Sequence, residues 1–390
     1  MEEYDTIVIG GGPVGLRAAH LIAEAGFTVT VVEKNKEIGF PNHCSGLVSA
    51  NFVSKYTEAQ ETVLNGIKGA MVTCENSTLE FKDAKFHAFA IDREKFDKLL
   101  AKKAVKDGVK ILTGEEPESV KKNSRFTGIK LKSGKILQSR TFVIASGANS
   151  GVSKLFGLYN KPMEIIHTIQ AEAEMEIPDK EIVYVFINKK LFGNWFGWII
   201  PTGNNTVKVG LGTDKKEDIM KLFDRFISET EMLKNANIRK NPVAWIIPIG
   251  ISQKTANLNA LVAGDSATQV KPLSGGGLFT GMFGGEIAAQ VIVSALKSNP
   301  ESADLSKYET LVFEKITPTV KRGLILRKIY KTIPDKDKAS FLEALDNPEA
   351  KKIITTYGDI DYPYLTGLKL LKFVRKPLLK YFTEMLRSAI

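Results

Sequence analysis

The sequence predicts a fold of the α/β plus α+β class: a Rossmann-like nucleotide-binding domain, an inserted antiparallel-sheet domain and a C-terminal helical region. Three observations support this prediction. Residues 4–33 read as a strand, a glycine-rich turn, a helix and a second strand. Strands dominate residues 161–257, where one helical segment interrupts them. From about residue 301 onward the pattern is helical and basic.

The first element, between Tyr4 and Glu33, carries a G-x-G-x-x-G turn directly after an apolar strand. Gly10 permits the tight turn, Gly12 lets the backbone approach a pyrophosphate, and Gly15 lets the next helix pack closely on the strand. That helix would direct its N-terminus at the phosphates, and Glu33 would accept hydrogen bonds from a ribose. The alternative is an ordinary strand-to-helix turn. The complete pattern predicts a dinucleotide site.

Composition sets the broad class. The chain has 390 residues, 43% of them hydrophobic and 25% charged, which is typical of a folded soluble protein of two or three domains. We find no run of about 18 apolar residues and expect no membrane-spanning helix. The acidic start leads into a strand, so we expect no secretion signal. Two cysteines, Cys44 and Cys74, make no metal-ligand pattern and favour a reducing, cytoplasmic location.

The net charge of +10 indicates either an anionic partner, such as nucleic acid, anionic lipid or an acidic protein, or a basic surface exposed to solvent. No nucleic-acid motif accompanies it, so nucleic acid is not expected. Basic residues alternate with apolar ones in the tail, a pattern suited to the surface of an anionic membrane. They are Lys369, Lys372, Arg375, Lys376, Lys380 and Arg387. We therefore expect peripheral contact with the inner face of the membrane, the alternative being a helix packed on the body of the protein.

A second glycine element lies far from the first. A buried strand ends at Gly264-Asp265, and after Pro272 three glycines, Gly275 to Gly277, open a long apolar helix. A flavin needs such an element, because its ribityl chain takes a carboxylate and its reduced ring carries negative charge that a helix N-terminus stabilises. The alternative is a glycine-rich loop with an Asp at the helix cap. Together, the two elements predict FAD.

Further motifs complete a resemblance to a known family. They are Ile91-Asp92-Arg93-x-x-Phe96, a strand ending at Ser146-Gly147, the loop Pro41 to Gly46, and Phe196-Gly197-Trp198-Ile199-Ile200-Pro201. With the glycine elements, they resemble the p-hydroxybenzoate-hydroxylase-type flavoproteins over roughly residues 1–300. Within that group the chain is most similar to the geranylgeranyl reductase family, through its cysteine loop and its aromatic-x-Trp-x-x-Pro signature.

The chain departs from the family pattern at three places. Ser45 stands where Gly would follow Cys44, and Phe196 and Ile200 replace a Tyr and a Phe. Ser146-Gly147 replaces the Asp-Gly of many hydroxylase relatives, an element linked with NADPH as well as FAD. The aromatic signature also resembles that of flavin halogenases. A flavin-dependent monooxygenase or halogenase on the same scaffold is therefore the alternative function, and a non-catalytic flavin- or lipid-binding protein is a third.

The resemblance implies an FAD-dependent reductase that saturates carbon–carbon double bonds of geranylgeranyl chains, in membrane lipids or their precursors. Hydride would come from reduced FAD, and a proton would reach the other carbon. The electron donor would be a ferredoxin-like protein, NADPH or another reduced carrier. Cys44 is the first catalytic candidate and His43 the second. The alternatives are a small buried hydrophobe for Cys44 and a solvated loop residue for His43.

The expected site residues fall into two further groups. Cofactor contacts are expected from Gly10, Gly12, Pro13, Val14, Gly15, Glu33, Lys34, Cys44, Ser45, Gly46, Arg93, Gly147, Gly264, Asp265, Pro272, Gly275, Gly276, Gly277 and Leu278. For Arg93 the alternative is a solvated cation at a helix start. Substrate contacts are expected from Tyr184, Phe186, Phe196, Trp198 and Pro201. Strand alternation places Phe196 and Trp198 on one face and Trp195 on the other, while some of these aromatics would be core.

The expected domains are discontinuous. The FAD-binding domain would comprise residues 1–70, 91–160 and 258–300, and the substrate domain residues 71–90 and 161–257. Residues 301–390 would form a separate C-terminal helical region.

Overall fold

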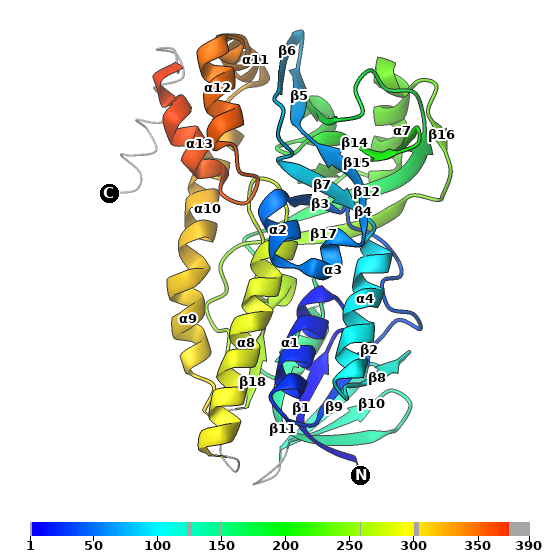
Figure 1. Cartoon of the computed structure of the whole chain (residues 1–390), viewed down its shortest axis with the longest axis vertical. Helices are drawn as coiled ribbons and strands as arrows, with labels where there is room; N and C mark the ends of the chain where they lie inside the picture. The colour runs from blue at the N-terminus through cyan, green and yellow to red at the C-terminus, as the bar shows by residue number, and fades with distance from the viewer. Residues whose placement is uncertain (1, 123–126, 149, 258, 300–303, 374–390) are drawn as a thin grey trace. The chain divides into compact units, whose positions relative to one another are not determined.

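The computed structural model describes residues 2–122, 127–148, 150–257, 259–299 and 304–373, which fold into two compact units (Figure 1). The first unit comprises residues 1–42, 93–164 and 248–321. The second comprises residues 43–92, 165–247 and 322–390. The predicted fold class is confirmed, whereas the two observed units place residues 43–70 in the second unit and residues 248–257 in the first, and divide residues 301–390 between the two.

The first unit is built on a seven-stranded sheet of order β8-β2-β1-β11-β10-β9, with β18 beside β11. Strands β1, β2, β8, β11 and β18 run parallel, and β9 and β10 are antiparallel. The strands are β1 (Glu2–Ile9), β2 (Val29–Glu33), β8 (Lys110–Thr113), β9 (Pro117–Lys122), β10 (Thr127–Leu131), β11 (Ile136–Ile144) and β18 (Ala260–Val262). Strands β10 and β11 form a hairpin, in whose turn Gly134 adopts φ +89°.

Helices α1 and α8 lie side by side in this unit (Figure 1). A Cβ built on Gly285 would lie 2.7 Å from the carbonyl oxygen of Val14, so glycine permits this close approach. Pro13 starts α1 at a position that needs no N–H donor. The helical segments of the unit are α1 (Pro13–Glu24), α4 (Arg93–Lys106), α5 (Ser150–Leu155), η2 (Gly264–Ala267), α8 (Leu278–Ser298) and α9 (Lys307–Lys315), with α10 (Thr317–Thr332) beginning there.

Helix α8 is long and apolar enough to cross a membrane, contrary to the expectation that no segment would be. The sequence search missed it because glycines and polar residues interrupt its apolar run. In the fold, 61% of the relevant window is buried, and its small residues pack against α1. Burial of this kind is what a core helix of a two-layer domain shows.

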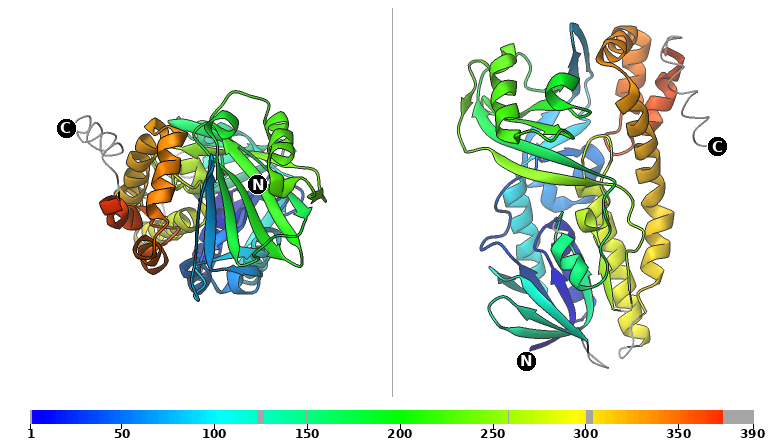
Figure 2. Two further views of the ribbon diagram at one scale, coloured as in Figure 1. Left: turned by 90° about the horizontal axis from the view of Figure 1, so that it is seen from above. Right: turned by 180° about the vertical axis from the view of Figure 1, so that it is seen from behind.

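The second unit is built on an eight-stranded sheet of order β16-β12-β15-β14-β13-β5-β6, with β17 beside β12. Helix α7 (Ile219–Glu229), capped by the Asp218 carboxylate, covers one face of this sheet (Figure 2). The strands are β5 (Gly69–Cys74), β6 (Ser77–Lys82), β12 (Glu164–Glu174), β13 (Ile182–Ile187), β14 (Gly197–Gly203), β15 (Thr206–Thr213), β16 (Asn237–Ile238) and β17 (Val243–Ile249). Short elements α6 (Lys189–Phe192) and η1 (Glu231–Leu233) flank α7.

Residues 43–70 belong to the second unit, not to the predicted FAD-binding domain. Strands β3 (Leu47–Ser49) and β4 (Val63–Ile67) pair with β7 (Ala88–Ile91) in a three-stranded sheet, and β5 pairs in parallel with β13. Two short helices, α2 (Ala50–Lys55) and α3 (Thr57–Gln60), lie between β3 and β4. Pairing between strands therefore decides the unit to which residues 43–70 belong.

Residues 301–390, predicted to form a separate C-terminal helical region, are divided between the two units. Helix α9 belongs to the first unit, while α11 (Asp335–Leu345), α12 (Pro348–Tyr357), α13 (Pro363–Leu370) and η3 (Leu371–Phe373) belong to the second. There, Leu342 and Ile354 share an apolar cluster with Cys74 of β5 and Leu79 of β6. The C-terminal helices thus complete the core of the second unit.

Candidate functional site

The glycine turn after β1 has the geometry that a pyrophosphate requires. Gly10 adopts φ +112°, and a Cβ there would overlap the carbonyl oxygen of Ala145 at the end of β11. A Cβ on Gly15 would overlap the Gly10 carbonyl oxygen. In contrast, nothing lies within 4 Å of a Cβ position on Gly12, so the turn is open at the residue where a phosphate would approach.

Glu33 is held in place at the end of β2. Its Oε2 accepts a hydrogen bond from the N–H of Gly11 at 2.7 Å, and its Oε1 accepts one from the N–H of Asn35 at 2.8 Å. A carboxylate offers about four acceptor positions, so two remain for the hydroxyls of a ribose. The next residue, Lys34, is exposed. The backbone therefore orients Glu33 for the ribose contact predicted from its position.

Asp265 lies beside the N-terminus of α8. A Cβ on Gly277, the residue before α8, would lie 2.9 Å from Asp265 Oδ1. The Asp265 side chain keeps some exposed surface, but the many protein atoms around it desolvate the carboxylate and raise its pKa to about 6. The charge of Arg93 acts in the opposite direction. Hydroxyl donors of a ribityl chain would stabilise the ionised form. Asp265 thus fits the flavin role that the sequence assigns to it.

Arg93 is not a solvated cation. Its side chain is 11% exposed and forms a forked ion pair with Asp97, with Nη2 lying 3.1 Å from Oδ1. The pair closes the first turn of α4 and fixes the guanidinium near Asp265, whose pKa it lowers. The structure therefore favours the cofactor-side interpretation of Arg93 over the surface one.

Three strand ends meet at the same edge of the first sheet. Ser266 Oγ donates to the carbonyl oxygen of Gly147 at 2.8 Å, and a Cβ on Gly264 would lie 3.0 Å from Val14 Cγ2. These contacts join the segments after β1, β11 and β18. Ligands of open α/β sheets bind beyond the carboxyl ends of parallel strands, which is the edge described here.

The remaining cofactor candidates form the entry to α8. Gly275 adopts φ +71°, and its N–H donates to the Lys271 carbonyl oxygen at 2.9 Å. A Cβ on Gly276 would lie 2.6 Å from Lys271 Cε, at the end of a flexible side chain, so the positive φ of Gly275 is the stronger requirement for glycine in this turn. Pro272 is buried within the turn, and Leu278 begins the helix. Taken together, the residues of the first unit fit an FAD.

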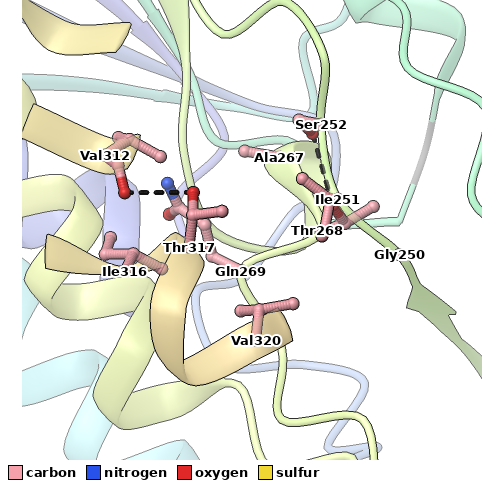
Figure 3. Close-up of a pocket in the computed structure, with 10 residues that line it drawn as sticks. All are labelled: Gly250, Ile251, Ser252, Ala267, Thr268, Gln269, Val312, Ile316, Thr317 and Val320. Atoms are coloured by element: carbon pink, nitrogen blue, oxygen red, sulfur yellow. Dashed lines mark hydrogen bonds between the residues drawn. The ribbon is translucent and has the colours of Figure 1, made fainter. Parts of the chain in front are cut away.

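A small recess lies directly behind this element in the first unit (Figure 3). About 240 Å³ of space lies within it, including the solvent at its open side, and Ser252 Oγ lies 3.3 Å from Thr268 Oγ1. Its lining residues are Gly250, Ile251, Ser252, Ala267, Thr268, Gln269, Val312, Ile316, Thr317 and Val320. None of them is titratable, so the recess contributes no proton donor.

The cysteine loop, residues His43 to Gly46, belongs to the second unit. The imidazole of His43 stacks on the indole of Trp245, with ring centroids 3.9 Å apart and planes 15° apart. The ring is therefore packed, and the solvated-loop alternative is wrong. The half-buried Cys44 accepts a hydrogen bond at Sγ from the N–H of Gly46 at 3.4 Å. The flavin contacts expected from Cys44, Ser45 and Gly46 stay predictions.

The predicted substrate residues divide between two faces of the second sheet. Tyr184 and Phe186 point into the core beneath α7, where the Tyr184 hydroxyl donates to the Asp179 carbonyl oxygen at 2.8 Å. By strand alternation, Pro201 also lies on that face. Trp198 lies on the opposite face, in a different apolar cluster. Tyr184 and Phe186 are therefore core residues, away from the face that carries Trp198.

Strand alternation predicts that Trp195 lies on the face opposite Phe196, and this prediction is wrong. The two rings stack, with centroids 5.2 Å apart and planes 10° apart, and the Phe196 ring meets Trp198 edge-on at 6.0 Å. The reason is that β14 begins at Gly197, so the alternation does not extend to the residues before it. The buried guanidinium of Arg327 lies 4.8 Å from the Trp195 ring and extends this stack.

Sequence reasoning missed two buried polar residues on the Trp198 face, Lys208 and Gln170. Lys208 Nζ donates to the Ser45 carbonyl oxygen at 3.0 Å. A Cβ on Gly210 would lie 2.5 Å from Trp198 Cζ2 and 2.7 Å from Gln170 Cβ, so this glycine separates the two side chains. The sequence signal that could have indicated Lys208 is the alternation of β15, in which this lysine stands between two valines.

The described part of the basic tail packs on the protein. The Lys369 ammonium lies 4.0 Å from the centroid of the Tyr357 ring, and Lys372 forms an ion pair with Glu349. For these two lysines the packed-helix alternative holds. The remaining tail cations, Arg375, Lys376, Lys380 and Arg387, lie outside the described residues.

Comparison with known proteins gives consistent results. A family model described as lycopene cyclase protein matches residues 5–347. An uncharacterised protein of Methanocaldococcus jannaschii is 34% identical over 376 residues, 95% of each chain. The digeranylgeranylglycerophospholipid reductase of the same organism is 29% identical, covering 98% of each chain. A geranylgeranyl bacteriochlorophyll reductase-like structure from Thermoplasma acidophilum superposes with a TM-score of 0.87 at 22% identity, over 99% of this chain and 100% of that one.

These matches run nearly the full length of the chain and include both glycine elements, the cysteine loop and the aromatic signature. They confirm the predicted family, enzyme class and cofactor. The chain therefore belongs to the lycopene cyclase protein family, and it is an FAD-dependent reductase similar to the geranylgeranyl reductases.

Proposed function

We propose that this protein saturates carbon–carbon double bonds of geranylgeranyl chains in membrane lipids or their precursors. One observation carries the proposal: the cysteine loop and the aromatic signature, about 150 residues apart in the sequence, contact neighbouring residues on one face of the second sheet. Lys208 binds the carbonyl oxygen of Ser45, beside Cys44, and two residues further along β15 the indole of Trp198 covers Gly210. Relatives that are named digeranylgeranylglycerophospholipid reductases support this substrate class.

The chemistry explains why this face is apolar. Reduced FAD supplies hydride, but an isolated alkene is a poor hydride acceptor, so the alkene must be held in place without water. Phe196 and Trp198 supply an aromatic surface for a prenyl chain, since each buried CH₂ contributes about 0.8 kcal/mol. Cys44, in the loop that Lys208 contacts, brings a half-buried thiol to this site, and we assign to its Sγ the task of holding or passing a proton.

The remaining parts of the proposal concern partners and location. The electron donor would be a ferredoxin-like protein, NADPH or another reduced carrier. Ser146 takes the place of the Asp associated with NADPH, which favours a carrier other than NADPH. The substrate resides in lipid, so we place the protein in the cytoplasm, at the inner face of the membrane.

Anaerobic reoxidation of the reduced protein tests this function. The holoprotein is reduced with dithionite and mixed with a geranylgeranyl lipid, and flavin absorbance is followed. We expect lipid-dependent reoxidation, and none with the fully saturated lipid. Stoichiometric oxygenation or halogenation of an added aromatic substrate in air would instead favour the monooxygenase or halogenase alternative. Reduced flavin that no prenyl lipid reoxidises would favour a binding protein.

A further inference from the structure

Lys208 is a buried lysine on the face of β15 opposite the apolar core beneath α7. Val207 and Val209 of β15 enter the cluster beneath α7, and Lys208 between them points to the opposite face. Lys208 is only 3% exposed. An ammonium loses hydration on burial, so such lysines are rare unless the fold gives them a polar partner and a use.

The observed partner is the backbone of the cysteine loop. Lys208 Nζ donates to the Ser45 carbonyl oxygen at 3.0 Å, a charge-assisted bond across 163 positions of sequence. The next residue, Gly46, adopts φ +72° and accepts a hydrogen bond at its carbonyl oxygen from the N–H of Ile91 at 2.9 Å. The Gly46 N–H donates to Cys44 Sγ at 3.4 Å. The two residues after Cys44 are therefore tied to two different strands, β15 and β7.

The aromatic face begins next to this lysine. Gly210, two residues along the strand and on the same side, lies under the Trp198 indole. Strand β15 thus supplies both Lys208, which binds the cysteine loop, and Gly210, against which the Trp198 ring packs. A shift of the Lys208 side chain would move the thiol relative to the surface on which we place the prenyl chain.

We propose that Lys208 is a positioning residue for Cys44 in the reduction proposed above. Its ammonium fixes the Ser45 carbonyl and so holds the thiol at a set place beside the Trp198 face. The proposal rests on the proposed function for its kinetic consequence, whereas the anchoring itself is independent of the reaction.

The test compares Lys208→Met, which keeps the length of the side chain without its donor, with Lys208→Arg, which keeps a cationic donor. Lys180→Met is the matched control, because Lys180 is an exposed lysine of the same unit that binds Asn205 at 2.7 Å. Two quantities are measured on each holoprotein. They are kcat and KM with a geranylgeranyl lipid, and the rate at which iodoacetamide alkylates Cys44, with buried Cys74 as internal reference.

We expect Lys208→Met to lower kcat at least about tenfold with KM changed less than about threefold, at normal FAD content and melting temperature. The Cys44 alkylation rate should change at least about fivefold, because thiol reactivity follows access and surroundings. Lys208→Arg should restore both quantities to within about threefold of wild type, and Lys180→Met should leave both unchanged. Lys208→Leu, which also lacks a donor, replaces Lys208→Met in the comparison if the latter does not fold.

Two results would overturn the proposal. One is a folded Lys208→Met or Lys208→Leu protein with wild-type kcat and Cys44 alkylation. The other is a parallel loss of FAD, melting temperature and activity that Lys208→Arg does not rescue, which would mark a purely structural lysine. If the wild-type protein reduces no prenyl lipid, the proposed function fails, and the alkylation rates still decide whether Lys208 anchors the loop.

Discussion

The indole ring of Trp198 occupies the space that a side chain on Gly210 would need. A Cβ built on Gly210 would lie 2.5 Å from Trp198 Cζ2, and on its other side 2.7 Å from Gln170 Cβ. In the described part of the chain, the buried Trp198 Nε1 and Gln170 Oε1 have no hydrogen-bond partner. Packing on Gly210, rather than a polar anchor, therefore holds the indole in place.

Replacing Gly210 with alanine should displace the Trp198 ring and impair the reduction. Overpacking of this kind costs about 1–3 kcal/mol of stability, and the indole is part of the surface proposed for the prenyl chain. We expect lower stability and a raised KM for the lipid, with FAD content retained because the cofactor residues lie elsewhere. Thermal melting and steady-state kinetics measure both effects.

Gly128→Ala is the matched control for that variant. Gly128 is also a strand glycine, but the nearest atom to its Cβ position is the Lys121 carbonyl oxygen at 3.7 Å, an ordinary contact. It should leave the KM unchanged. Equal kinetics for Gly210→Ala and wild type would show that the Trp198 position does not matter for turnover.

Cys44→Ser and Cys44→Ala should both retain FAD and lose turnover by at least about 100-fold, the usual range for removing a proton-transfer group. The control is Cys74→Ala. Cys74 is buried in the cluster with Leu79 and Leu342, its Sγ donates to the Asp335 carbonyl oxygen, and burial raises the pKa of its thiol to about 12, so the thiol stays protonated at neutral pH. This control should be less stable but equally active. Unchanged rates in both Cys44 variants would remove Cys44 from the mechanism.

Asp265→Asn should stabilise the FAD-free protein at neutral pH while weakening FAD binding. The folded-state pKa of Asp265, about 6, lies above the reference value of 3.8, so the folded state binds more protons than the unfolded chain between these values. Stability therefore falls as pH rises from about 4 to about 6. The cost at pH 8 is at most about 3 kcal/mol, reduced by the water that still reaches the side chain.

Chemical unfolding of the FAD-free wild type and variant checks this at pH 4 and pH 8. The variant should be the more stable protein at pH 8 and close to wild type at pH 4. Its FAD content after purification should be lower. Identical unfolding curves at both pH values would show that Asp265 carries no burial cost, and unchanged FAD affinity would exclude its assigned contact.

Removing the residues beyond 365 should weaken binding to anionic liposomes by at least about tenfold, since each basic residue near such a surface contributes about 1 kcal/mol. Sedimentation with vesicles of anionic lipid, compared with purely zwitterionic vesicles, measures the effect. Binding to anionic vesicles that equals that of the full chain would refute a membrane role for the tail.

Local patterns predicted the elements that position the cofactor. The turn at Gly10 to Gly15, the strand ending at Glu33 and the element at Gly264-Asp265 are short-range signals, because each depends on neighbouring residues alone. The meeting of these elements also follows from a general rule, since parallel strands present their carboxyl ends at one edge.

Long-range pairing decided what the sequence could not reveal. Residues 43–70 read as part of the first domain, yet β5 pairs with β13, more than 100 residues away, and no local signal reports that partner. The role of Lys208 was hidden for the same reason, because its partner Ser45 is 163 positions distant. Trp195 was misplaced by extending strand alternation past the start of β14.

The most direct test of the central claim is the mass of the lipid product. Dithionite-reduced holoprotein is incubated anaerobically with a geranylgeranyl lipid, and the lipids are analysed by mass spectrometry. The account predicts products heavier by steps of two daltons, one step for each double bond reduced, and absent when Cys44→Ala replaces the wild type. A lipid recovered at unchanged mass, with protein that carries fully reduced FAD, would contradict it.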